Sequence, residues 1–226
     1  MIKQLLCTFI ISCTLFPQPT HAQSRAEWRD SLEKINRMVN LSPHSVELRL
    51  RKAAINLELE QWEYAAEEYG RVLEIEPANL SALYFRAYAN SRLNRLDMAR
   101  RDYERILSRV PRHFEAQLGL AMILRQMNHA AETIDQLNQL VQMYPDSAMA
   151  YVARAGFETE QRQYDLAVYD WEQARRLAPD NIDYLVSEVE TLLQAKQKKE
   201  ARNLLEQAIH HGVPVITLKE WLERCK

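Results

Sequence analysis

The chain has 226 residues, of which only 4 are glycine and 27% are charged. This mixture of helix formers with few turn residues is typical of an all-helical protein, and the length excludes a miniprotein. A net charge of −2 and a pI near 6.3 provide no basic excess for nucleic acid or for an anionic membrane surface, so we expect neither as a partner.

Residues 1–22 have the pattern of an export signal rather than of a folded segment. Lys3 gives a weakly positive start, residues 5–16 are mainly apolar, and residues 20–22 stand where a signal peptidase reads small side chains. The apolar run is too short for a permanent membrane anchor. We therefore expect cleavage near Ala22, export to the periplasm or the extracellular space, and no transmembrane span in the mature chain.

A second interpretation of the same segment concerns Cys13. Ile10-Ile11-Ser12-Cys13 is similar to a loose lipobox, in which Cys13 would be lipidated and become the mature N-terminus. The residues after it are apolar, whereas lipoproteins usually continue with a polar tether, so cleavage near Ala22 is favoured. Cleavage there leaves Cys225 as the one cysteine, which cannot form an internal disulfide, so stability must come from packing.

Five prolines recur at a fixed interval of 34 residues. They are Pro43, Pro77, Pro111, Pro145 and Pro179. Proline ends a helix because it has no N–H and disfavours helical dihedrals in the residue before it. A fixed period of this length indicates one supersecondary unit repeated along the chain.

Helix-packing residues follow the same period when each proline is given position 32 of a row. Position 8 is Ala53, Ala87, Ala121, Ala155 and Val189, and position 20 is Ala65, Ala99, Thr133, Ala167 and Ala201. Small residues there let two antiparallel helices approach closely. Position 34 holds serine or asparagine, which are good N-caps, in every row except that of His113. We therefore expect helix A to start after position 34, a turn at positions 14–18, and helix B to end before the next proline.

These rows resemble the tetratricopeptide repeat, a 34-residue helix-turn-helix unit with small residues at 8 and 20 and proline at 32. The resemblance implies an all-α fold, a right-handed α-solenoid of five repeats with an N-terminal half repeat and a C-terminal capping helix. The expected parts are a signal peptide at 1–22, a helix at 23–45, repeats at 46–79, 80–113, 114–147, 148–181 and 182–213, and the capping helix at 214–226. Position 15, often glycine in the family, is Glu60, Asn94, Asn128, Arg162 and Lys196 here.

Positions 7 and 23 carry opposite charges in three rows. The pairs are Lys52 with Glu68, Arg86 with Asp102, and Arg154 with Asp170, whereas the third row has Leu120 with Gln136 and the fifth has Glu188 with Leu204. Charges that appear and vanish together indicate contact between the two helices of a repeat. Because each acid has its own cation, we interpret the carboxylates as structural rather than catalytic.

The C-terminal residues predict a helix that closes the array. Val213 stands where the sixth proline is due, and Thr217-Leu218-Lys219-Glu220 has the pattern of a capping box. We expect Trp221 to pack on helix B of the fifth repeat, since the terminal repeat of an array needs a cover for its apolar face.

No pattern in the sequence predicts catalysis. The histidines lack the spacing of metal ligands, and four scattered glycines make no phosphate-binding loop. We therefore expect no enzyme activity, no cofactor and no metal.

The resemblance does imply a binding surface, because A helices line the concave side of such arrays. Family ligands usually contact positions 2, 5, 9, 12 and 13. Here the candidate protein-binding residues are Tyr84, Tyr88, Arg92, Leu118, Met122 and Arg125. Aromatic, Met and Arg side chains are common anchors of recognition surfaces. The alternative is that position 5 belongs partly to the core. The family's carboxylate clamp uses Lys and Asn at positions 5 and 9, and this chain has neither there.

We thus expect a non-enzymatic adaptor of the cell envelope that holds a peptide or helix of another protein in the A-helix groove. The alternative is a fixed structural subunit of an envelope complex, docked by its convex B-helix face or by its ends.

Overall fold

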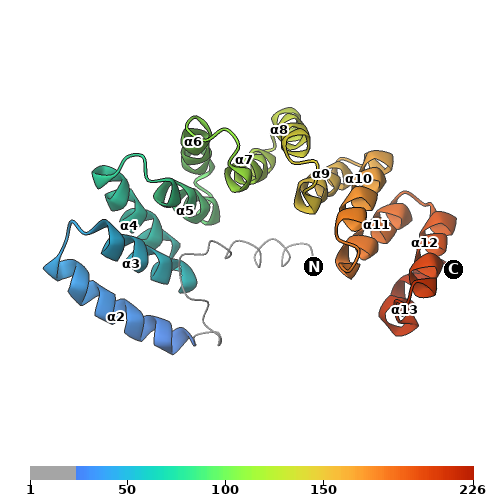
Figure 1. The fold of residues 1–226 in the computed structure, drawn as a ribbon, viewed down its shortest axis with the longest axis horizontal. Coiled ribbons are helices and arrows are strands. Elements are labelled where there is room, and N and C mark those ends of the chain that lie inside the picture. The colour runs from blue at the N-terminus through green and yellow to red at the C-terminus, as the bar shows by residue number, and fades with distance from the viewer. Residues whose placement is uncertain (1–23) are drawn as a thin grey trace. The chain divides into compact units, whose positions relative to one another are not determined.

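The structure is a computed structural model that describes residues 24–226. The expected signal peptide, its cleavage site at Ala22 and the alternative lipidation site Cys13 lie outside the described residues. Between residues 24 and 226 every regular element is an α-helix (Figure 1). The all-α prediction is therefore confirmed.

Ten of the helices form five helix-turn-helix pairs. The A helices are α3 (Val46–Glu58), α5 (Leu80–Arg92), α7 (Phe114–Gln126), α9 (Ala148–Glu160) and α11 (Ile182–Gln194). The B helices are α4 (Trp62–Ile75), α6 (Leu96–Leu107), α8 (Ala130–Met143), α10 (Tyr164–Leu177) and α12 (Lys198–His210). Each A helix begins at position 1, and the B helices of the first four pairs end before the next proline, as the 34-residue frame predicts.

The chain divides into two compact units, which we describe separately. The first extends to Pro77 and contains α2 (Arg25–Leu41), α3 and α4. In it, Ile35 and Val39 of α2 pack on Ile55 and Leu59 at the end of α3. A single helix thus covers one side of the first pair.

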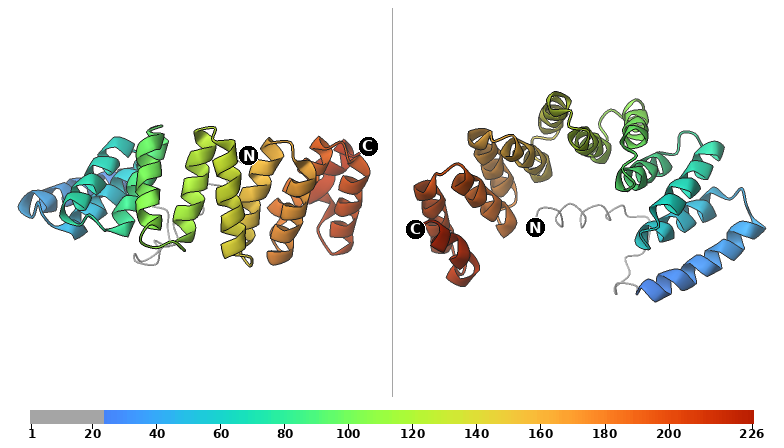
Figure 2. Two further views of the ribbon diagram at one scale, coloured as in Figure 1. Left: turned by 90° about the horizontal axis from the view of Figure 1, so that it is seen from above. Right: turned by 180° about the vertical axis from the view of Figure 1, so that it is seen from behind.

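The second unit, from Ala78 onwards, holds α5 to α12 and the short α13 (Val215–Arg224). Each helix in it packs against the next one along the chain (Figure 2). Its core consists of successive clusters between neighbouring pairs, such as Ala121, Leu137 and Leu140 with Ala150. Every A helix of this unit is therefore fixed by helices that adjoin it in sequence.

The side chain at position 34 caps four of the five A helices, and the residue types predict three of these four caps. The side chains of Ser45, Asn79 and Asn181 accept backbone N–H groups, as predicted. His113 also caps, because its Nδ1 accepts the N–H of Ala116 at 3.3 Å. Ser147 makes no side-chain cap bond, so that prediction is wrong.

The predicted capping box at Thr217 is wrong as well. Helix α13 already starts at Val215 after Pro214, which puts Thr217 inside its first turn. A capping box does exist at the start of α2, where Ser24 and Glu27 exchange hydrogen bonds of 2.6 and 3.3 Å. Pro214 has the fixed φ of a helix start, and this takes precedence over the short sequence pattern.

Position 15 has a left-handed backbone in all five repeats. The φ angles of Glu60, Asn94, Asn128, Arg162 and Lys196 lie between 58° and 63°. Glycine adopts this region without steric cost, and asparagine tolerates it better than other residues. The turn between helices A and B therefore imposes strain at Glu60, Arg162 and Lys196.

Replacing Arg162 or Lys196 by glycine is expected to raise the free energy of unfolding by about 1 kcal/mol, because the left-handed strain disappears. Asn128→Gly should gain less than half as much. Urea denaturation of each variant measures the change. Equal gains at Asn128 and Arg162, or a loss at Arg162, would contradict the assignment of strain to this turn.

Candidate functional site

Three of the candidate residues lie on α5. Tyr84 is half-buried and meets the buried ring of Tyr103 edge-on, with ring centroids 5.8 Å apart. Tyr88, one turn further, is also half-buried, and its hydroxyl accepts a 3.4 Å hydrogen bond from the exposed Arg92. Tyr84 is thus partly a core residue, as the alternative interpretation of position 5 holds, while Tyr88 and Arg92 form a more exposed pair.

The other three candidates lie on α7, which packs against α5. Leu118 and Met122 are half-buried against the cluster of Ala121 and Leu137. Arg125 forms an ion pair with Glu160 at the end of α9. The structure therefore places the six residues on two adjoining A helices of one unit, with Leu118 and Tyr84 packed against the core and Arg92 exposed.

Gly119 lets α7 approach the helix pair before it closely. A Cβ atom built there would lie 2.5 Å from Cζ of Tyr103, whose side chain is almost fully buried. Tyr84 rests on the same ring, so this contact positions part of the candidate surface. The repeat pattern assigns no role to Gly119, because position 6 has no fixed residue type in this chain.

The predicted charge pairs between positions 7 and 23 are confirmed. Arg86 donates two hydrogen bonds to Asp102, at 2.8 and 2.7 Å, and Arg154 donates two to Asp170, at 2.6 and 2.8 Å. Lys52 Nζ lies 2.8 Å from Glu68 Oε1. The acids are buried between helices A and B, which supports a structural role for them.

Rows without this pair use other partners. Gln136 donates a hydrogen bond to Gln117, whose own amide donates to the carbonyl of Pro111 at 2.9 Å. Glu188 accepts a 2.9 Å hydrogen bond from Arg175 on the preceding B helix. In rows three and five, other polar contacts therefore take the place of the charge pair. In the third row one of them comes from position 4, which is Gln117.

A further acid, Glu158, lies inside the fourth pair, and its pKa is raised. Burial raises its pKa to about 7, the nearby Asp170 carboxylate acts in the same direction, and Arg154 opposes them. One carboxylate oxygen lies 3.9 Å from Arg154, and the other is buried with no hydrogen-bond partner among the described residues. Arg154 already donates two hydrogen bonds to Asp170, so its positive charge compensates the negative charge of ionised Glu158 poorly.

Glu158 should therefore make the protein less stable as the pH rises. Its pKa is higher in the folded chain than the value of 4.5 expected when unfolded, so between about pH 4.5 and 7 the folded state binds the extra proton. Glu158→Gln is expected to match wild type near pH 4.5 and to be more stable at pH 8. Melting temperatures across this range test the prediction, with exposed Glu220→Gln as control. Parallel curves for Glu158→Gln and wild type would contradict it.

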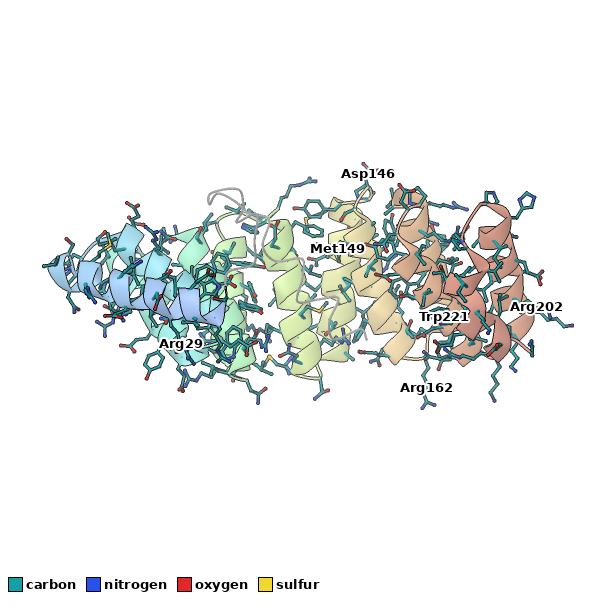
Figure 3. All side chains as sticks on the ribbon, turned by 90° about the horizontal axis from the view of Figure 1, so that it is seen from below. Arg29, Asp146, Met149, Arg162, Arg202 and Trp221 are labelled. Carbon is teal, nitrogen blue, oxygen red and sulfur yellow. The ribbon has the colours of Figure 1, made fainter. Side chains whose placement is uncertain are left out.

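The capping helix α13 covers the last A helix, α11, at Glu190. This residue holds position 9 of the fifth repeat, as Tyr88 does in the second. Trp221 of α13 donates its indole N–H to Glu190 at 3.2 Å, and it packs in a cluster with residues of both α11 and α12. Figure 3 shows Trp221 against the C-terminal helices, whereas Arg202 projects outward from α12. Packing on helix B was predicted; the contact with α11 was not. Position 9 of the fifth repeat is therefore covered by the chain itself.

Metal ligation and membrane insertion find no support in the described part of the chain. From residue 24 to the C-terminus, no group of three or more His, Cys, Asp or Glu side chains could hold a metal ion. Over the same range, none of the helices combines the length and apolar character needed to span a bilayer.

Comparison with protein families and solved structures identifies the repeat. Residues 115–147 match the family model described as "Tetratricopeptide repeat". No curated protein matches the chain in sequence. PilW, described as a widely conserved type IV pilus biogenesis factor, is 17% identical with a TM-score of 0.69, covering 88% of this chain and 90% of its own.

Two further solved structures have the same fold. A tetratricopeptide repeat protein from Parabacteroides merdae is 20% identical with a TM-score of 0.66, over 89% of this chain and 78% of its own. YrrB, described as a tetratricopeptide repeat protein with an unusual peptide-binding site, is 14% identical with a TM-score of 0.57. The match covers 79% of this chain and 92% of YrrB. Residues 115–147 thus match the tetratricopeptide repeat model, and the chain shares the fold of solved tetratricopeptide repeat proteins.

Proposed function

We propose that the chain is a non-enzymatic adaptor that binds a peptide or helix of another protein on the A-helix surface of α5 and α7. We define this surface as Tyr84, Tyr88, Arg92, Leu118, Met122 and Arg125. The observation that carries the proposal is the combination of half-buried aromatic and apolar side chains with arginines on two packed A helices. Such side chains anchor protein interfaces because they bury large areas while retaining a polar group.

The fold comparisons support this class of function without fixing the partner. YrrB is described as having a peptide-binding site, and PilW is described as a pilus biogenesis factor. The fold that YrrB shares with this chain suits the same kind of role, the binding of a peptide. We further propose that the adaptor acts in the cell envelope after removal of residues 1–22, because the leader has the layout of a secretory signal.

Capture of partners by the purified, tagged mature chain tests the surface. Tyr88→Ala combined with Arg125→Glu should abolish capture of a specific partner, while circular dichroism and melting temperature show that the fold persists. The matched control is Tyr169→Ala with Arg202→Glu. Tyr169 is 57% exposed on a B helix, and Arg202, like Arg125, is in an ion pair.

The same pair of variants separates the two candidate functions. The fixed-subunit alternative is favoured by Leu166 and Tyr169, which are 56% and 57% exposed on the B helix α10. Loss of capture in the Tyr169 variant with capture retained in the Tyr88 variant would overturn the A-helix surface and support docking through α10. Intact mass of the mature protein from the native host tests the leader, since acyl chains on Cys13 would contradict cleavage near Ala22.

A further inference from the structure

Two glycines lie in the interior of A helices, and the packing of the chain explains one of them. At Gly119 a Cβ atom would meet the buried ring of Tyr103. At Gly156, in α9, a Cβ atom would have no neighbour within 4 Å among the described residues, so the space there is open. Glycine inside a helix is less stable than alanine. The packing of α9 therefore gives no reason for a glycine at this position.

The backbone of Gly156 is held firmly on both sides. Ala155 and Phe157, its neighbours in the chain, are 0% and 4% exposed, and Gly156 itself is half-buried. Val152, one turn earlier on the same face of α9, packs against the cluster that contains Trp171. The open space is therefore a fixed feature in the middle of a packed helix.

This space adjoins the proposed binding surface through Met122. Met122 of α7 packs against the cluster that contains Ala153, three residues before Gly156. One turn further along both helices, Arg125 of α7 forms its ion pair with Glu160 of α9. The A-helix surface of α5 and α7 therefore continues onto α9 at the level of Gly156.

The polar side chains next to Gly156 already have partners inside the chain. The Thr159 hydroxyl donates a 2.8 Å hydrogen bond to a backbone carbonyl of α9 and lies 3.3 Å from the Thr191 hydroxyl of α11. Arg125 and Glu160 are paired with each other. A charged group of a partner would compete with these bonds, whereas an apolar side chain leaves them intact.

We propose that the open space at Gly156, which we call the notch, receives one large apolar side chain of the partner's bound segment. The side chains around the notch are Met122, Val152 and Thr159. The inference rests on the proposed function, because it names the anchor of the ligand that the same surface holds. A large side chain that fills a pocket usually contributes a major share of the binding energy.

The chain itself contains a contact of this kind at the fifth repeat. Trp221 of α13 donates its indole N–H to Glu190, which holds position 9 of that repeat as Gly156 does in the fourth. Trp221 belongs to the cluster that also includes Val186, at position 5. A large aromatic side chain from another helix thus contacts position 9 of one A helix, and the notch leaves room for one at the A helix before it.

Selection of binders from a random 12-residue peptide library against the mature chain tests the inference. We expect the selected peptides to be enriched in Leu, Phe, Trp or Met. Gly156→Leu fills the notch and should weaken binding of a selected peptide at least about tenfold. The control Asn203→Leu adds the same side chain at an exposed position of α12 and should leave binding within about twofold of wild type.

Two further measurements separate a filled notch from a damaged fold. Replacing the large apolar residue of the peptide by alanine should weaken binding to wild type about tenfold, but it should cause little further loss with Gly156→Leu, because the two changes remove the same contact. Gly156→Ala should raise the melting temperature and still weaken binding about threefold. Additive losses in the first measurement, or unchanged binding in the second, would contradict the notch.

Other outcomes distinguish failure of this inference from failure of the proposed function. Binding that is lost with Tyr88→Ala but unchanged by Gly156→Leu would overturn the notch while leaving the surface of α5 and α7 intact. Selected peptides without a large apolar residue would overturn the apolar anchor. Selection of no peptide above background, or binding that neither variant affects, would overturn both proposals.

Discussion

Replacing Asp102 by alanine is expected to lower the free energy of unfolding by about 2–3 kcal/mol, because the variant leaves Arg86 without its carboxylate between α5 and α6. Asp102 is 2% exposed and accepts both hydrogen bonds of the Arg86 guanidinium. The Arg86 side chain keeps 21% exposure and can partly reach solvent, so the loss should fall short of that for a fully buried cation. Urea denaturation measures it.

The double variant Arg86→Ala with Asp102→Leu should be less destabilised than Asp102→Ala alone, since it leaves no buried charge. Glu206→Ala is the surface control: it breaks the exposed pair with Arg202 and should change stability by less than about 0.5 kcal/mol. A double variant as unstable as the single one would show that the pair itself, rather than the unpaired charge, determines the stability.

Gly119→Ala should destabilise the chain by about 1–3 kcal/mol although alanine is the better helix former. The new methyl would lie 2.5 to 2.9 Å from three atoms of the Tyr103 side chain. That ring is buried and packed edge-on against Tyr84, so it cannot move aside without disturbing the candidate surface. We also expect weaker partner binding in this variant, measured by the same capture assay.

Gly156 provides a matched control within another A helix. A Cβ atom there has no neighbour within 4 Å among the described residues. Gly156→Ala should therefore stabilise the chain by about 0.5–1 kcal/mol through helix propensity alone. The two substitutions are thus expected to have opposite signs. Equal effects on the urea midpoint would contradict the close approach of α7 to Tyr103.

The helix pattern could be predicted from the sequence because a single repeated signal located it. Pro77, Pro111, Pro145 and Pro179 each stop a helix and simultaneously set the frame for the next one. The charge pairs were predictable for a similar reason, since the third row lacks both the cation and the acid that other rows carry together. Repetition inside one chain thus provided the comparisons that a single copy could not.

Local details were less predictable where two interactions compete. His113 caps α7 because an imidazole nitrogen can accept an N–H, whereas Ser147, a residue type that more often caps, makes no such bond at α9. The box at Thr217 fails because Pro214 starts the helix earlier. The left-handed turn at Arg162 is hidden because a large side chain replaces the glycine that would have signalled it.

The sequence predicts which helices carry the candidate surface, but it does not predict how deeply each of the side chains is buried. The frame places Tyr84, Tyr88 and Met122 on A helices, and the structure does so too. Side-chain burial depends on contacts across helices that periodicity does not specify. The packing of Tyr84 on Tyr103 and the pairing of Arg125 with Glu160 are both of this kind.

Site-specific photo-crosslinking in the native host tests the central claim most directly. A photoreactive phenylalanine analogue in place of Tyr88 or Met122 should yield the same crosslinked protein partner on irradiation. The analogue in place of Tyr169, which is exposed on the B helix α10, should not. A partner crosslinked from Tyr169 and from neither A-helix position would contradict binding on the surface of α5 and α7.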